Sequence, residues 1–286
     1  MDDETKRKRK TFVRISVISV IALLLILINS GGFFTSVNGQ ITSNNRTVTT
    51  TTFKTGPLPV LLIHGYFEDS SIWHRWEQLL TKDRIPFIEV NFGFFQGSYY
   101  DECGTAVDHA NDLSTIIQHT FQDMKTRTGQ NQVNIVAHSK SGLDARVYLA
   151  SSDTRDVANL IMIGTPNKGS PLAYSNNYCW PAVDDIKPGA ADTTIGENNN
   201  TKYYTIAGDW NPSLMSNCPP VENFFQFDWP TFEKEGYSKL QKPNDGIVPV
   251  SSVESQGYFH NLGHTLDCHT NLLSERSFAK AEQYLR

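Results

Sequence analysis

The chain has 286 residues, 39% of them hydrophobic and 11% aromatic, which suffices for one large domain or two small ones with a sizeable core. It carries 25 Lys and Arg against 30 Asp and Glu, and because basic side chains outnumber acidic ones in residues 1–39, the remainder is more acidic still. This balance argues against nucleic acid as a partner, since phosphate binding needs a positive surface.

Residues 1–39 have the pattern of an export signal. The basic cluster Lys6–Lys10 precedes Ile15–Ile28, a run of 14 residues that contains only apolar side chains and serine. This run is short for a membrane span of roughly 20 residues, and the small residues Val37 and Gly39 suit a cleavage site. We therefore predict cleavage and secretion. The alternative is retention of the segment as an N-terminal membrane anchor, with the protein on the extracellular side.

Residues 40–55 are rich in threonine and asparagine, so we predict a tether here and one folded domain over residues 56–286. Strand-like apolar runs alternate with amphipathic, helix-length segments in that domain. The predicted strands are Pro59–Ile63, Phe87–Asn91, Val133–Ala137, Leu160–Ile163 and Tyr203–Ala207, and the predicted helices are Ser71–Leu80, Thr105–Thr126 and Gly142–Ala150. This order predicts an α/β fold with a parallel sheet and helices on both faces.

The strand at Val133–Ala137 runs directly into His-Ser-Lys-Ser-Gly and then into a helix. A serine on such a strand-to-helix turn is the local design of a nucleophile elbow, in which the positions two before and two after the serine must be small. Ala137 and Ser141 satisfy this requirement around Ser139, whereas Ser141 as nucleophile would require Leu143 at a crowded position. We predict Ser139 as the nucleophile and the backbone N–H of Lys140 as an oxyanion donor.

Four segments in order resemble lipases and esterases of the α/β-hydrolase superfamily, of the bacterial or archaeal triacylglycerol lipase type. They are Leu61–Tyr66 (LLIHGY), Ala137–Leu143 (AHSKSGL), Gly164–Ser170 (GTPNKGS) and Asn244–Ser252 (NDGIVPVSS). The resemblance implies an α/β-hydrolase fold with an inserted cap over residues 56–286. It also implies that His64-Gly65 begins the oxyanion segment and that the N–H of Tyr66 is the second oxyanion donor. Ser141 departs from the family pattern, which has glycine at this position.

The acid of a catalytic triad orients the base and stabilises its charged form. Asp245 lies in a Pro-Asn-Asp-Gly turn before an apolar run, Gly246–Val250, and we predict that it lies at the carboxyl end of a late strand, where ligand sites of such sheets gather. The simpler explanation is that Asn-Asp-Gly only forms a tight turn. Asp245 can form this turn and act as the catalytic acid at the same time. Asp209 and Asp267 are the competing acids.

Three histidines follow Asp245 and satisfy the chain order of nucleophile, acid and base: His260, His264 and His269. His269 is the predicted base, because His-x-x-Leu-Leu before the last helix resembles lipases whose base precedes that helix. His264, near a strand end, resembles a second family variant and is the alternative. His260 is expected within a strand.

Residues 167–202 interrupt the alternation of strands and helices with several prolines and a polar Asn-rich stretch. Long irregular segments in compact domains are often lids. We predict a cap over the mouth of the site, with the aromatic side chains Tyr174, Tyr178 and Trp180 folded toward it. The four cysteines allow two disulfides in any of three pairings, and a Cys179–Cys218 bond would limit opening of the cap.

The sequence thus predicts an exported serine hydrolase that cleaves carboxylic esters, small or lipid, through an acyl-enzyme. It predicts neither an organic cofactor nor a metal, and any membrane contact would run through the N-terminal segment. Amides, thioesters or polyesters are alternative substrates, because fold and triad do not fix the leaving group. An inactive scaffold that serves as a surface binding module is the alternative of a different class.

Overall fold

The structure is a computed structural model that describes residues 39–43, 46–50, 56–92, 103–128, 130–151, 154–175, 180–190, 195–214, 218 and 228–286. The chain divides into two compact units, Met1–Lys54 and Thr55–Arg286. In the first unit, β1 (Gly39–Ser43) and β2 (Arg46–Thr50) pair as an antiparallel hairpin. Part of the predicted tether is therefore a small sheet, since its threonine and valine residues suit strands. The predicted export signal lies outside the described residues, apart from Gly39.

Six parallel strands form the sheet of the second unit, in the order β4-β3-β5-β6-β7-β8. The strands are β3 (Val60–Ile63), β4 (Phe87–Val90), β5 (Val133–His138), β6 (Val157–Ile163), β7 (Lys202–Gly208) and β8 (His260–Thr265). The five strands predicted from the sequence are all present, and β6 begins three residues earlier than expected. The prediction of a parallel α/β fold is confirmed.

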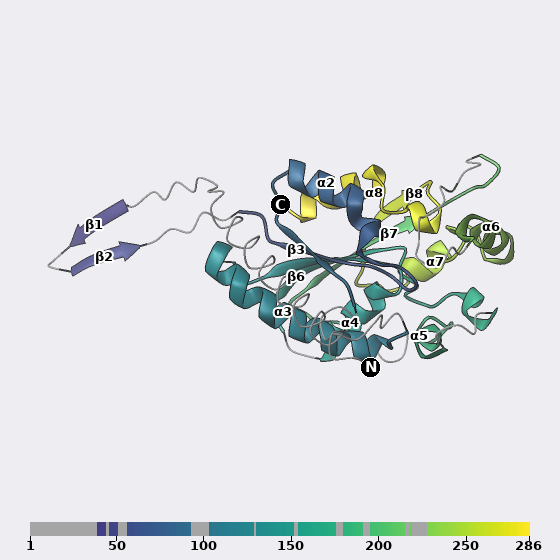
Figure 1. Ribbon diagram of the computed structural model, residues 1–286, viewed down its shortest axis with the longest axis horizontal. Helices are drawn as coiled ribbons and strands as arrows, with labels where there is room; N and C mark the ends of the chain where they lie inside the picture. The colour runs from purple at the N-terminus through teal and green to yellow at the C-terminus, as the bar shows by residue number, and fades with distance from the viewer. Residues whose placement is uncertain are drawn as a thin grey trace, which may run out of the picture. The chain divides into compact units, whose positions relative to one another are not determined.

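Helices cover both faces of this sheet (Figure 1). The helices are α2 (His74–Lys82), α3 (Ala106–Thr128), α4 (Ser141–Ser151), α5 (Trp180–Asp185), α6 (Trp229–Lys239), α7 (Val250–Val253) and α8 (Glu275–Ala281). Short 3-10 turns lie at Ser70–Trp73, Pro171–Ser175, His269–Asn271 and Glu282–Tyr284. Among the described residues, no helix is both long enough and apolar enough to cross a membrane.

Alternation along the strands builds a separate core on each face of the sheet. Leu61 and Ile63 of β3 pack in one cluster with Leu113 of α3, while Val60 and Leu62 pack in the other with the tryptophans Trp73 and Trp76 and with Phe278 of α8. All of these side chains are buried. Because strands buried on both faces are continuous apolar runs, their sequence identifies them as central strands of a parallel sheet. This rigid centre fixes the carboxyl ends of the strands.

One expected strand-like run is different in the structure. Gly246–Val250 forms a loop that leads into α7, with an isolated bridge between Asn244 and Pro249. The run is apolar because Val248 and Val250 pack against Ala207 of β7, not because it joins the sheet. A buried apolar run of five residues is compatible with either state, and periodicity alone does not separate them.

Candidate active site

The predicted nucleophile lies on a strained turn between β5 and α4. Ser139 has a φ of 56°, a left-handed conformation that is uncommon for residues other than glycine. Ser141 is buried and its hydroxyl faces the backbone oxygens of Ile63 and His138, each at 2.8 Å. A Cβ atom on the next residue, Gly142, would lie 2.1 Å from Oγ1 of Thr165, so the turn is crowded one position beyond Ser141.

Ser139, His269 and Asp245 lie together at the carboxyl edge of the sheet. Oγ of Ser139 is 2.9 Å from Nε2 of His269, and Nδ1 of His269 is 2.8 Å from Oδ2 of Asp245. Because an ionised carboxylate only accepts hydrogen bonds, this contact puts the proton of a neutral His269 on Nδ1. Nε2 is then free to accept the hydroxyl proton of Ser139, as a general base requires.

The turn chemistry of the Asn-Asp-Gly sequence fixes Asp245. Its Oδ1 accepts the N–H groups of Ile247 at 2.9 Å and Val248 at 2.6 Å, so only Oδ2 faces His269. Gly246 has a φ of 97°, which favours glycine at this position. Asp245 does not follow a strand in the chain, contrary to expectation. It reaches the carboxyl end of β7 in space, where a Cβ on Gly208 would lie 2.6 Å from its own Cβ.

The alternative site residues lie elsewhere. His264, in β8, contacts Glu254 at 2.9 Å and its side chain is 35% exposed. Asp267 is bound by Arg276 and by the hydroxyl of Ser274. The distances therefore favour His269 over His264 as the base and Asp245 over Asp267 as the acid. His260 begins β8, as expected for a strand residue.

The segment predicted to hold the oxyanion lies directly against Ser139. A Cβ on Gly65 would lie 2.7 Å from Cβ of Ser139, so only glycine lets the two backbones approach this closely. His64 shapes the loop: its Nδ1 donates to the backbone oxygen of Gly65 at 3.0 Å, and its Nε2 accepts the N–H of Phe92 at 3.4 Å. Burial lowers the pKa of His64, which suits this neutral form. Tyr66 follows in this loop, and Phe67 has a strained φ of 65°.

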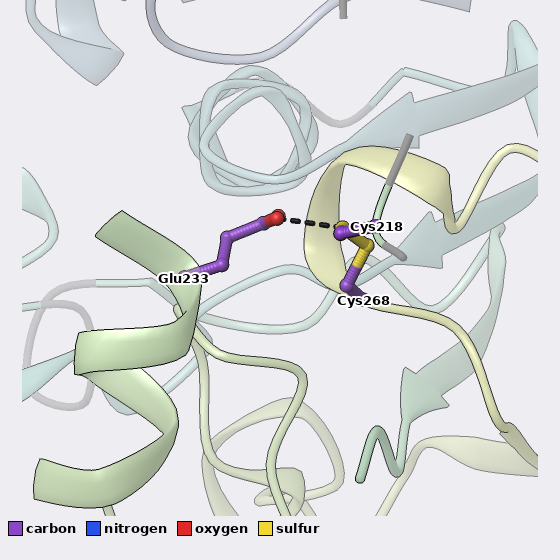
Figure 2. Close-up of side chains that lie close together, drawn as sticks. All are labelled: Cys218, Glu233 and Cys268. Atoms are coloured by element: carbon purple, nitrogen blue, oxygen red, sulfur yellow. Dashed lines mark hydrogen bonds between the residues drawn. A yellow bond between two sulfur atoms is a disulfide. The ribbon is translucent and has the colours of Figure 1, made fainter. Parts of the chain in front are cut away.

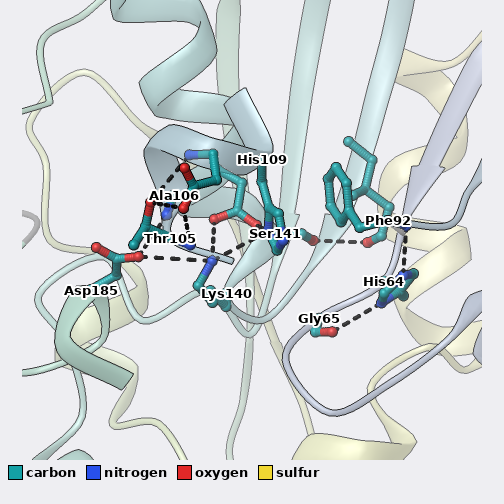
Figure 3. A network of polar contacts seen from close by, with 12 residues as sticks. His64, Gly65, Phe92, Thr105, Ala106, His109, Lys140, Ser141 and Asp185 are labelled. Carbon is teal, nitrogen blue, oxygen red and sulfur yellow. Dashed lines mark hydrogen bonds and ion pairs between the residues drawn. The ribbon is translucent and has the colours of Figure 1, made fainter. Parts of the chain in front are cut away.

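A buried polar network fixes Lys140, the residue after the predicted nucleophile. Its Nζ lies 2.7 Å from Asp144, 3.4 Å from Nδ1 of His109 and 3.9 Å from Asp185 (Figure 3). Asp185 comes from α5 and also accepts the N–H of Ala106 at the start of α3. Burial would raise the pKa of Asp144, but the charge of Lys140 and a hydrogen bond from His109 hold it below its usual value. The Lys140 side chain is thus turned away from Ser139, and only its backbone can serve an oxyanion there.

The predicted cap divides into two parts. Ser170 and Asp185 lie at the carboxyl edge of the sheet: Oγ of Ser170 donates to the Ile247 oxygen at 2.5 Å, and Asp185 contacts Lys140. Asn198 and Thr201 lie at the opposite end, where Thr201 donates to the oxygen of Val157 at the start of β6. The segment predicted as a cap thus includes residues at both ends of the sheet, and the cap stays a prediction.

Two of the three aromatic residues predicted to fold toward the site are exposed to solvent. Tyr174 is 65% exposed and Trp180 is 64% exposed. Tyr178 lies outside the described residues. The burial argument fails here because isolated apolar side chains on a surface are common and cost little.

The structure replaces the predicted Cys179–Cys218 bond with a disulfide between Cys218 and Cys268 (Figure 2). Cys103 is also disulfide-bonded, and Cys179 lies outside the described residues. Spacing along a sequence does not determine pairing, because the fold decides which cysteines meet. The observed bond fastens the residue before His269 to Cys218, which precedes α6 in the chain.

Glu233, which sequence analysis did not single out, points from α6 toward this disulfide (Figure 2). It is fully buried; its Oε1 accepts the N–H of Thr270 at 2.8 Å and its Oε2 lies 2.7 Å from Sγ of Cys218. A disulfide sulfur has no proton to donate, so this second contact calls for a protonated Glu233. Burial raises the pKa of Glu233 to about 8, and the charge of Asp245 adds to the increase. The raised pKa agrees with the protonated form that the sulfur contact requires.

Cys218, Glu233 and Cys268 are also a group whose potential metal-ligand atoms lie within 4.8 Å of one another. Metals bind the thiolate form of cysteine. Because the two sulfurs are joined in a disulfide, the group does not fit a metal ion in this form of the protein.

Residues 59–210 match the family model of the alpha/beta hydrolase fold. The sequence is 24% identical over 177 residues to triacylglycerol lipase 2 of Saccharomyces cerevisiae, a match that covers 56% of this chain and 53% of that protein. It is 26% identical over 121 residues to a triacylglycerol lipase of Pseudarthrobacter phenanthrenivorans, covering 40% of this chain and 35% of the relative. The chain therefore spans about half or less of the length of these curated relatives.

A crystal structure of a metagenomic carboxyl esterase has the same fold, with a TM-score of 0.57 at 14% identity over 84% of this chain and 79% of the other. The six-stranded parallel sheet and the family match together define an alpha/beta hydrolase fold. The family match covers more than half of the chain, so the chain belongs to the alpha/beta hydrolase fold family.

Proposed function

We propose that the protein hydrolyses carboxylic esters with Ser139 as nucleophile, His269 as base and Asp245 as the acid that orients it. The observation that carries this proposal is the strained φ of Ser139 together with the Oγ–Nε2 distance of 2.9 Å and the Nδ1–Oδ2 distance of 2.8 Å. The similarity to triacylglycerol lipases supports esters as the substrate class.

In the first half of the reaction, Oγ of Ser139 bonds to the carbonyl carbon of the ester while Nε2 of His269 takes the hydroxyl proton. The N–H groups of Tyr66 and Lys140 stabilise the oxyanion that forms. His269 then gives its proton to the alcohol oxygen as the carbon–oxygen bond breaks, which leaves an acyl group on Ser139.

In the second half, His269 takes a proton from water, and the hydroxide oxygen bonds to the acyl carbon. The bond to Oγ of Ser139 breaks, the serine regains its proton from His269, and a carboxylic acid leaves. Asp245 stabilises the imidazolium in both halves through its Oδ2. Two N–H groups hold its Oδ1, so the carboxylate keeps Oδ2 directed at His269. Every proton is returned, so these steps balance without a cofactor.

A panel of p-nitrophenyl esters of increasing acyl length tests this function. We expect hydrolysis of at least the short, soluble members. Folded protein that hydrolyses no member of the panel, but cleaves p-nitroanilides, would move the proposal to amides. Folded protein without activity on either class would favour a binding module.

We further propose that the protein is exported by its N-terminal segment and acts outside the cell, either free or attached to the membrane. The basic cluster Lys6–Lys10 followed by Ile15–Ile28 carries this proposal. Expression in a secreting host, followed by N-terminal sequencing of the product, tests it. A mature N-terminus near Gly39 indicates cleavage, an intact segment in the membrane fraction indicates an anchor, and intact protein in the cytosol contradicts export.

A further inference from the structure

A second carboxylate–histidine pair lies directly behind Ser139. Oε2 of Glu68 is 2.7 Å from Nδ1 of His138, and the two side chains are only 8% and 1% exposed. Glu68 lies in the loop after β3, and His138 is the last residue of β5. The pair is not part of the Ser139–His269–Asp245 arrangement, yet it lies within that arrangement's immediate surroundings.

Each member of the pair also holds the backbone of another loop. Oε2 of Glu68 accepts the N–H of Gly65 at 2.8 Å, in the loop that presents Tyr66. Nε2 of His138 lies 3.1 Å from the backbone oxygen of His269. One hydrogen-bonded chain therefore joins the predicted oxyanion segment, the elbow and the loop that bears the predicted base.

The contacts determine the charge of His138. One ring nitrogen faces a carboxylate and the other faces a carbonyl oxygen, and both of these groups only accept hydrogen bonds. The ring must donate from both nitrogens, which makes His138 an imidazolium. Burial alone would lower the pKa of His138, but the charge of Glu68 and its hydrogen bond outweigh burial and raise it. The pKa of Glu68 is lowered by His138 in spite of burial.

This charge lies next to the base. The ring centroids of His138 and His269 are 4.8 Å apart. Glu68 from the loop after β3 contacts the His138 ring, and Asp245 from the loop before α7 contacts the His269 ring. His138 therefore meets His269 through its ring as well as through its backbone oxygen.

We propose that Glu68 and His138 are positioning residues for the ester hydrolysis proposed above, which fix the Gly65–Tyr66 backbone and the His269 loop relative to Ser139. The inference rests on that proposed function. Glu68 and His138 act through the Gly65 N–H and the His269 carbonyl. The pair also requires Gly65 to be glycine, because a Cβ there would lie 2.7 Å from Oε2 of Glu68.

The test compares Glu68→Gln and His138→Asn with Glu254→Gln, which removes the carboxylate of the exposed Glu254–His264 pair. Glu68→Gln keeps the shape and an acceptor oxygen but removes the charge that keeps His138 doubly protonated. We expect kcat on a short p-nitrophenyl ester to fall by about tenfold or more, with KM within about threefold. Glu254→Gln should keep both constants within about twofold.

His138→Asn supplies a readout that a merely structural role would not move. Asparagine can still donate to Glu68 but loses the contact to the His269 oxygen. A merely structural role would lower only the fraction of active molecules, whereas a positioning role lowers kcat per active site counted by titration with a fluorophosphonate, by about tenfold or more. If Glu68→Gln does not fold, His138→Asn decides the question by itself.

Two results would overturn the inference: wild-type kcat in both folded variants, or lost activity in His138→Asn that disappears when kcat is expressed per titrated active site. Wild-type protein assayed in parallel separates the two proposals. If the wild type hydrolyses no ester, the proposed function fails. If the wild type is active while Glu68→Gln and His138→Asn behave like Glu254→Gln, only the positioning role fails.

Discussion

His264 and His269 lie close in sequence, and each has a carboxylate partner at nearly the same distance, 2.9 Å to Glu254 and 2.8 Å to Asp245. Their surroundings differ. The His264 pair is partly exposed to water, where an ion pair contributes little, and among the described residues the contact of its ring is with Glu254, not with a serine. The His269 pair is buried, and its second ring nitrogen faces Ser139. A carboxylate partner alone does not identify a base; a third, reactive partner within a buried site does.

Replacement of each elbow serine by alanine should give the largest difference in activity. Ser139→Ala should lower kcat/KM on p-nitrophenyl esters by about 10⁴ or more, because the nucleophile is lost. Ser141→Ala should keep much of the activity, since its hydroxyl only meets the backbone oxygens of Ile63 and His138. Steady-state kinetics of both purified variants measure the difference. Equal losses in both would reverse the assignment of the nucleophile.

Replacement of His264 or of His269 by alanine tests the comparison between these two histidines. His269→Ala should lower kcat by on the order of 10³ or more, because Ser139 loses its proton acceptor. His264→Ala should keep kcat within about twofold, since its ring only meets Glu254. The measurement is kcat on the same ester at a fixed pH. A greater loss in His264→Ala than in His269→Ala would contradict the geometry.

The buried acid beside the His269 loop predicts how stability depends on pH. The folded-state pKa of Glu233 is raised to about 8 from an ordinary 4.5, so the folded protein binds more protons between these values. The free energy of unfolding therefore falls as pH rises through this window and levels off above about pH 8. Glu233→Gln mimics the protonated form and should remove this fall. Relative to the wild type, the free energy of unfolding of the variant should be higher by up to roughly 4 to 5 kcal/mol at pH 9 and should differ little at pH 5.

Urea unfolding at several pH values measures this effect, with Glu235→Gln as the control on the same helix, where the carboxylate faces water. We expect the control to keep the wild-type dependence on pH. Parallel curves for wild type and Glu233→Gln across the whole range would show that the buried carboxyl does not titrate in this window.

Loss of the disulfide should have a smaller effect. The Cys218–Cys268 bond closes a loop with a sequence separation of 50, so replacement of both residues by serine should lower the free energy of unfolding by roughly 2 to 4 kcal/mol. Because Cys268 precedes His269, we also expect a modest decrease in kcat, by a few fold. Unfolding and kinetics of the double variant measure both effects. Unchanged stability would show that the bond does not constrain the unfolded chain.

The sequence predicted the elbow and the family-defining segments because their constraints are local. Ala137, Ser139 and Ser141 alone express the crowding of a strand-to-helix turn, and β5 is a continuous buried run. The choice of His269 depended on its place before the last helix, and the distances favour it. The partner of Cys218 was predicted wrongly, since pairing depends on where distant loops meet.

Other features had weaker or no local signals. Helix α6, which presents Glu233, was not among the predicted helices. Asp228 before Trp229-Pro230 is nevertheless a helix-start signal, and Asp228 accepts the N–H of Thr231 at 3.2 Å. Glu68 had no such signal. A single acid in a loop acquires its role only when the fold brings His138 and Gly65 to it, so no pattern of spacing reveals it.

The most direct test of a working Ser139 is reaction of the folded protein with a fluorophosphonate, followed by mass spectrometry of the peptides. Covalent attack on this probe needs both an activated serine and an oxyanion site. We predict one phosphonylated residue, Ser139, and strongly reduced labelling in His269→Ala. Labelling of Ser141 instead, or no labelling of folded wild-type protein, would contradict the assignment of Ser139 as the nucleophile activated by His269.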